Sequence, residues 1–170
     1  PPELDWQQLR GILLALLDHH PALRLRLIDS AGAQRQLEVR PSGAVDAGDW
    51  LTRVDTSRLD GDALHASIAE QRNAAESRLS PANGSIVQAT WLDAGRERPG
   101  RLLLTIHHLA VDGVSWRILT DDLKRAWEAI AQGKRPELPP EGASFRRWAS
   151  ELQAHANNAS CRAELAWWTT

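Results

Sequence analysis

The sequence has a single cysteine, Cys161, and almost no excess of charge of either sign. One cysteine excludes an internal disulfide framework and is typical of a protein in the reducing cytosol. The formal net charge of −2 comes with no cluster of basic residues that would attract nucleic acid or an anionic membrane. Composition therefore gives no support for a disulfide-stapled scaffold or for a nucleic-acid-binding protein.

The sequence also lacks the segments that direct a chain to a membrane. It contains no signal peptide, no lipidation motif and no run of about 18 apolar residues. We therefore expect a soluble, cytoplasmic protein without a membrane partner. Its 170 residues, 42% of them hydrophobic, can bury one sizeable core, so length alone predicts a single domain.

The most informative stretch runs from Ile106 to Gly113 and contains two histidines, an aspartate and a glycine. It follows an apolar strand predicted at 102–106, and we expect Gly113 to allow a tight turn into a helix. Successive side chains of a strand point to opposite faces, so His107 and His108 are not expected to face the same cavity. Because imidazole suits proton transfer near neutral pH, one histidine is a candidate catalyst and the other a packing residue.

Three other interpretations of this run stay open. His107, His108 and Asp112 could bind zinc or iron, but adjacent strand histidines diverge, so we expect no metal. Ser115 could be a nucleophile, but no GxSxG elbow surrounds it and a helix cap is expected there. Both histidines could be hydrogen-bonded core residues, although their clustering with Asp112 and Gly113 argues against it.

Periodicity along the chain predicts alternating helices and strands, hence an α/β fold, α+β in detail, with a mixed sheet flanked by helices. Asp5 is placed to cap the first helix, with Gln8 three residues on. Residues 30–32 predict a turn, residues 41–48 a loop and residues 133–142 a surface linker. Helices are expected at 6–19, at 62–78, from 115 to a glycine at 133 and from about 144, and strands at 23–27, 36–40, 86–92 and 102–106.

The segment from His107 to Gly113 resembles the HHxxxDG signature of the chloramphenicol-acetyltransferase-like superfamily, which includes condensation and epimerization domains of nonribosomal peptide synthetases. The segment DHHPALRLR at 18–26 is similar to the family's helix-to-strand segment of the type RHEALRTRF. Val114 and Trp116 resemble epimerization domains, whereas condensation domains more often place an aromatic residue directly after the glycine. The resemblance spans most of residues 4–168.

This resemblance implies that the parent enzyme inverts the α-carbon of an aminoacyl or peptidyl thioester. The thioester is held on the phosphopantetheine arm of a peptidyl carrier protein, so no cofactor is expected on this chain itself. Inversion needs a base near neutral pKa and a second group that returns the proton from the opposite face. The resemblance implies His108 for one role and a glutamate of a second lobe for the other.

The resemblance also implies that residues 1–170 are a partial N-terminal lobe. The upstream strand and helix and the whole second lobe are then separate partners, together with adjacent synthetase modules, and the isolated chain is expected to be inactive. A condensation domain that forms peptide bonds and a noncatalytic carrier-docking half-domain are the alternatives. We also expect exposed apolar surface near Trp167 and Trp168.

The remaining candidate residues have structural interpretations. His107 is expected to be a positioned structural residue, pointing into the lobe while His108 points into an open groove. Asp112 is expected to bind backbone N–H groups of a turn, and the resemblance implies that it pairs with Arg24. Trp116 either packs in the core or shapes the substrate channel. His19 and His20 are expected at a helix C-terminus, without a functional role.

Overall fold

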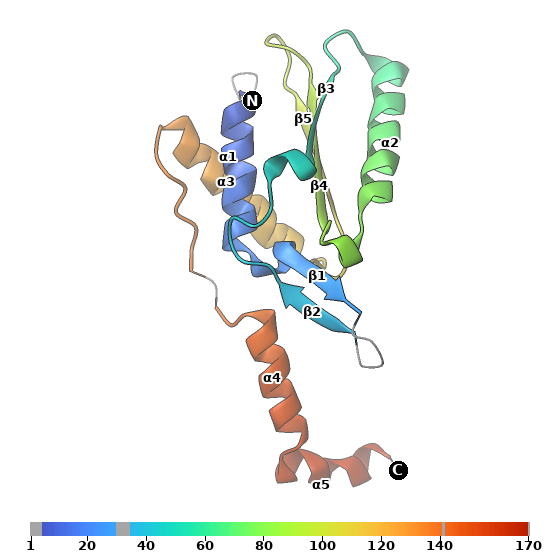
Figure 1. Cartoon of the computed structure of the whole chain (residues 1–170), viewed down its shortest axis with the longest axis vertical. Coiled ribbons are helices and arrows are strands. Elements are labelled where there is room, and N and C mark those ends of the chain that lie inside the picture. The colour runs from blue at the N-terminus through green and yellow to red at the C-terminus, as the bar shows by residue number, and fades with distance from the viewer. Residues whose placement is uncertain (1–4, 30–34, 141, 170) are drawn as a thin grey trace. The chain divides into compact units, whose positions relative to one another are not determined.

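The computed structural model describes residues 5–29, 35–140 and 142–169. It divides into two compact units, Pro1–Leu138 and Pro139–Thr170. The first unit contains a mixed sheet flanked by helices, and the second contains two helices (Figure 1). None of the helices in the described ranges is long and apolar enough to cross a bilayer.

Helix α1, Trp6–His19, begins and ends where the sequence predicts. Its first turn is closed by a capping box, in which Asp5 accepts from the Gln8 backbone N–H at 2.7 Å and Gln8 accepts from the Asp5 N–H at 3.2 Å. Spacing by three and four residues gathers the apolar side chains on one face, where each contributes about 1.5–3 kcal/mol on burial. This face consists of Leu9, Ile12, Leu13, Leu16 and Leu17.

A small antiparallel hairpin follows α1. Strand β1, Leu25–Ile28, pairs with β2, Gln36–Val39, with Leu25 opposite Val39. The strand predicted at 23–27 starts later because Pro21 opens a 3-10 turn, Pro21–Arg24, in which proline fixes the first helical position. The turn predicted at 30–32 lies outside the described residues.

The central sheet has three strands in the order β3-β4-β5. Strand β4, Val87–Asp93, pairs in parallel with β3, Leu51–Asp55, and antiparallel with β5, Arg101–Ile106. The sequence prediction placed a loop at 41–48 and missed β3, and a 3-10 turn, Ala47–Asp49, leads into it. The predicted mixed sheet is therefore confirmed, with one additional strand.

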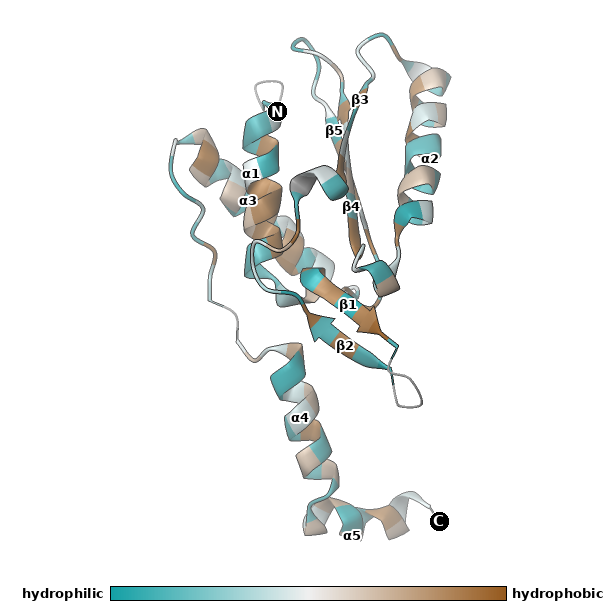
Figure 2. Cartoon of the chain, viewed as in Figure 1, coloured by the Kyte–Doolittle hydropathy of each residue, from teal (hydrophilic) through white to brown (hydrophobic). Residues whose placement is uncertain are grey.

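Helices cover the sheet on both sides (Figure 1). Helix α2, Gly61–Arg78, connects β3 to β4 and lies on one side, whereas α1 and α3, Ser115–Ala131, lie together on the other. The main core is on the α1–α3 side, where a Cβ at Gly11 would come within 3.3 Å of Ile130 Cδ1. Figure 2 shows the difference, because α1 and β4 are rich in hydrophobic residues and α2 is mostly pale or hydrophilic.

The second unit contains α4, Phe145–Ala156, and α5, Ala159–Trp168. The sequence predicted one helix starting near residue 144, and the structure divides that segment. The division occurs at Asn158, which caps α5 by accepting from the Ser160 N–H at 2.8 Å. Trp167 and Trp168 are 73% and 71% exposed, as predicted from the sequence.

Candidate functional site

The two histidines of the signature lie directly after β5. The His107 N–H donates to the Ile86 carbonyl at 2.9 Å, which continues the β4–β5 pairing by one residue. His107 is half-buried, and its Nδ1 accepts from the Leu109 N–H at 3.1 Å. A backbone N–H can only donate, so a neutral His107 ring carries its proton on Nε2. His108 is exposed, so the exposures of the two rings agree with the predicted alternation.

Asp112 fixes the turn between the histidines and α3. Its carboxylate accepts from the Val114 N–H at 3.0 Å, the Ser115 N–H at 2.8 Å and the Ser115 hydroxyl at 2.7 Å. Hydrogen bonds from the backbone and then the side chain of Ser115 lower the pKa of Asp112 below its ordinary value. The expected binding of backbone N–H groups is confirmed, but Asp112, not Ser115, caps α3.

Gly113 does not have the backbone reason that the sequence predicted. Its φ is outside the positive range, unlike those of Gly84 and Gly133, and nothing lies within 4 Å of an added Cβ. The tight-turn explanation is therefore wrong, because the carboxylate of Asp112 holds this turn and any residue could adopt the Gly113 backbone.

Arg24 does not pair with Asp112. The Arg24 side chain is buried and donates to three carbonyls, with Nε 3.0 Å from Arg40 O and Nη1 2.8 Å from Asp18 O and hydrogen-bonded to Leu17 O. No ion pair joins it to Asp112 in the described part of the chain. The predicted pairing is wrong because Arg24 satisfies carbonyls left open at the C-terminus of α1, while Asp112 is bonded within its own turn.

Apolar residues surround the signature on α3. Trp116 is half-buried and packs against the main core, which favours the packing interpretation; a role in a channel stays a prediction. Val114 and Ile118, one helical turn apart, are exposed, as is Leu109 beside His108. An apolar ligand near His108 would therefore meet uncovered hydrophobic side chains.

The structure brings together one cluster that sequence reasoning missed. His19 and His20 lie at the C-terminus of α1 as predicted, but His20 Nε2 is 3.1 Å from Asp122 Oδ2. Asp122 is buried on α3, between Leu119 and Ala126 on the same face. A carboxylate within an apolar helical stripe is the signal that could have indicated this contact.

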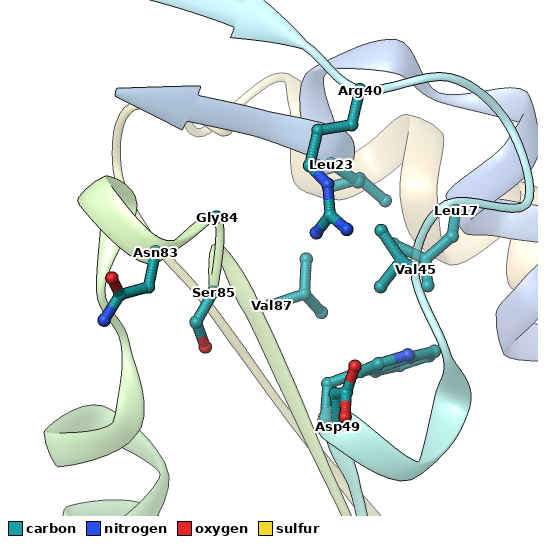
Figure 3. A pocket seen from close by; sticks show the side chains of 10 residues that line it. Leu17, Leu23, Arg40, Val45, Asp49, Asn83, Gly84, Ser85 and Val87 are labelled. Atoms are coloured by element: carbon teal, nitrogen blue, oxygen red, sulfur yellow. The ribbon is translucent and has the colours of Figure 1, made fainter. Parts of the chain in front are cut away.

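A cavity of about 180 Å³ lies between the hairpin and the start of β4 (Figure 3). Arg40 extends its guanidinium toward it, and Asp49, Asn83 and Ser85 supply polar groups at its edge. The Trp50 Nε1 is buried without a hydrogen-bond partner in the described residues. This cavity contains none of the residues predicted for catalysis.

Comparison with known proteins gives large synthetases. The chain is 36% identical over 170 residues to a linear gramicidin synthase of Brevibacillus parabrevis, covering 97% of this chain and 2% of that protein. It is 35% identical to chondramide synthase cmdD of Chondromyces crocatus, covering 90% and 4%. The chain thus spans a small part of the length of these relatives.

Solved structures show the same lobe. The epimerization domain from the third module of tyrocidine synthetase B superimposes with a TM-score of 0.84 at 29% identity, covering 97% of this chain and 36% of that chain. The starter condensation domain of rhizomide synthetase has a TM-score of 0.77 at 17% identity, covering 98% and 38%, which shows the fold alone. Residues 1–170 match the Condensation domain family throughout. The chain therefore belongs to the Condensation domain family and forms part of a condensation-type domain.

Proposed function

We propose that this chain is part of an epimerization domain of a nonribosomal peptide synthetase. The domain would convert the L-aminoacyl or peptidyl residue on a carrier-protein phosphopantetheine thioester to the D form. The observation that carries the proposal is the exposed His108 at the end of β5, held beside a half-buried His107. The similarity to an epimerization domain at 29% identity supports this choice over condensation.

His108 is proposed to exchange a proton with the α-carbon of the substrate. A hydrogen α to a thioester is acidic enough for a base of near-neutral pKa, and imidazole has this property. Inversion requires removal of the proton from one face and return to the other, so one group is insufficient. The second group is proposed to come from another lobe of the same domain, and the phosphopantetheine arm from a carrier protein.

The neighbouring residues are proposed to position His108. His107 is fixed by its bonds to Ile86 and Leu109, and Asp112 fixes the following turn. The loop that carries His108 is therefore anchored on both sides, which limits the positions that its imidazole can take. Such preorganisation is the usual structural contribution to proton transfer.

The test uses a complete domain that contains this chain, with an L-aminoacyl carrier protein in deuterated water. We expect uptake of deuterium at the α-carbon and appearance of the D-isomer, measured by mass spectrometry and chiral chromatography of the released amino acid. His108→Ala should abolish both, whereas His65→Ala, which removes an exposed imidazole of α2, should leave both unchanged.

A condensation domain is the second candidate, because it shares the fold and the signature. It would use His108 to position or deprotonate the attacking amine. The two functions differ without an acceptor amine, since only an epimerase then exchanges the α-hydrogen. Amide formation without exchange would favour condensation, and neither reaction would favour a carrier-docking half-domain. Exchange that persists in His108→Ala would contradict the proposed role of this residue.

A further inference from the structure

We propose that His19, His20 and Asp122 form a binding site for one divalent first-row metal ion, with Zn²⁺ as the probe. One ligand atom from each side chain lies within 4.8 Å of the other two. Two of the residues end α1 and the third comes from α3, 102 positions after His20. Two imidazole nitrogens and a carboxylate oxygen are a ligand set used by zinc and by non-haem iron.

The two adjacent histidines converge because α1 ends between them. His19 is the last helical residue, and His20 has an extended backbone with φ −98° and ψ 100°. The change of backbone direction turns the second ring toward the first, and their centroids are 4.8 Å apart with the planes at 89°. Adjacent histidines on a regular strand would diverge, so the objection to a metal at His107 and His108 does not apply here.

Two of the ligand atoms already have the spacing that a metal requires. His20 Nε2 and Asp122 Oδ2 are 3.1 Å apart. Tetrahedral zinc with bonds of about 2.0–2.1 Å places neighbouring ligand atoms about 3.3 Å from each other. A bound ion could therefore replace the His20–Asp122 hydrogen bond with little change in either side chain, and rotation of the His19 side chain would complete the protein ligands.

The surroundings of Asp122 fit a metal ligand. Its side chain is only 6% exposed, and a buried carboxylate needs a cation or hydrogen bonds beside it. Arg125 Nη1 lies 3.7 Å from Oδ1, which orients the carboxylate and leaves Oδ2 toward His20. The Arg125 side chain is itself half exposed, so water screens its charge from an ion on the other oxygen.

Such an ion would join the end of α1 to the middle of α3. Helix α3 begins directly after Asp112 and Gly113, so its position sets the direction in which the signature loop leaves β5. The site is therefore proposed to be structural. It is distinct from His107 and His108 and does not depend on the proposed epimerization.

The test is a metal titration of the full 170-residue chain after removal of metals with a chelator. We expect one Zn²⁺ per chain by calorimetry, a rise in melting temperature on addition of Zn²⁺, and visible absorption bands of a nitrogen- and oxygen-ligated ion when Co²⁺ is used instead. His19→Ala and Asp122→Asn should each lower the affinity at least about tenfold. His65→Ala, on α2, should leave it unchanged and serves as the matched control.

His19→Ala is the decisive variant, because it leaves the His20–Asp122 hydrogen bond in place and should not prevent folding. Circular dichroism of the metal-free variant checks this. The proposal is overturned if the chain binds no stoichiometric Zn²⁺, or if binding persists at full affinity in both His19→Ala and Asp122→Asn. Loss of binding in His108→Ala instead would place the ion at the signature and would also overturn it.

Discussion

The burial of Arg24 makes its replacement the most informative test of how this lobe is held together. In Arg24→Met, a side chain of similar length keeps the packing but loses the guanidinium. Three carbonyls lose a donor, those of Leu17, Asp18 and Arg40. The Leu17 bond is buried and the other two are partly buried.

The magnitude follows from how far water can replace each bond. A buried acceptor left without a donor costs about 1–3 kcal/mol, which applies in full to Leu17 O. The two partly buried carbonyls can recruit water, so each contributes about 0.5–1.5 kcal/mol. We therefore expect Arg24→Met to lower the free energy of unfolding by about 2–5 kcal/mol, with Arg24→Lys between the two because an ammonium cannot reach all three carbonyls.

The assay is equilibrium unfolding in urea, followed by the fluorescence of the eight tryptophans. Arg26→Met is the matched control, because Arg26 is an exposed neighbour with one exposed hydrogen bond, and it should cost less than about 1 kcal/mol. A double-mutant cycle with Asp112→Ala should give a coupling energy within about 0.5 kcal/mol. A cost below about 1 kcal/mol for Arg24→Met, or strong coupling to Asp112, would refute this account of Arg24.

Three other perturbations test the signature turn, the sheet and the isolated lobe. Because Ser115 lowers the pKa of Asp112 below its ordinary value of 3.8, the ionised cap stabilises the fold above that pH and is lost as the pH falls below it. Asp112→Ala should therefore lower the melting temperature at pH 7, and the difference from the parent chain should shrink below about pH 3. Gly100→Ala should destabilise by about 1–3 kcal/mol, since its Cβ would lie 2.6 Å from Trp91 Cη2, whereas Gly113→Ala, with open space, should be nearly neutral in urea unfolding. The isolated chain should give no D-isomer from an L-aminoacyl carrier protein in chiral chromatography, because it supplies only one of the two proton-transfer groups; a D-isomer above the uncatalysed rate would contradict this.

Local signals explain which elements the sequence predicted well. Helix α1 was placed to the residue because Asp5 and Gln8 form a capping box before a regular apolar stripe. Strand β3 was missed because Leu51 and Val54 are three positions apart, so the segment lacks alternation; its partner β4 is supplied from beyond α2. The division of the last helix was also missed, although Asn157 and Asn158 are residues that favour helix ends.

The candidate site shows the same division between local and distant contacts. The bonds from Asp112 to Ser115 span three positions and could be anticipated from turn chemistry. Both long-range pairings were beyond the sequence, since the Arg24–Asp112 pair was wrong and the His20–Asp122 contact was missed. A single sequence indicates that a buried polar residue needs a partner, but many distant residues could serve.

The signature loop is a locally wired unit. Within the described residues, the side-chain hydrogen bonds of 107–115 join positions no more than three apart. A loop held in this way depends little on distant parts of the chain for its shape, because the loss of a remote contact does not unlink it. Exchange of the surfaces that face His108 should therefore change which substrate reaches this imidazole while leaving the direction of its side chain intact, which makes the loop a suitable fixed point for redesign of specificity.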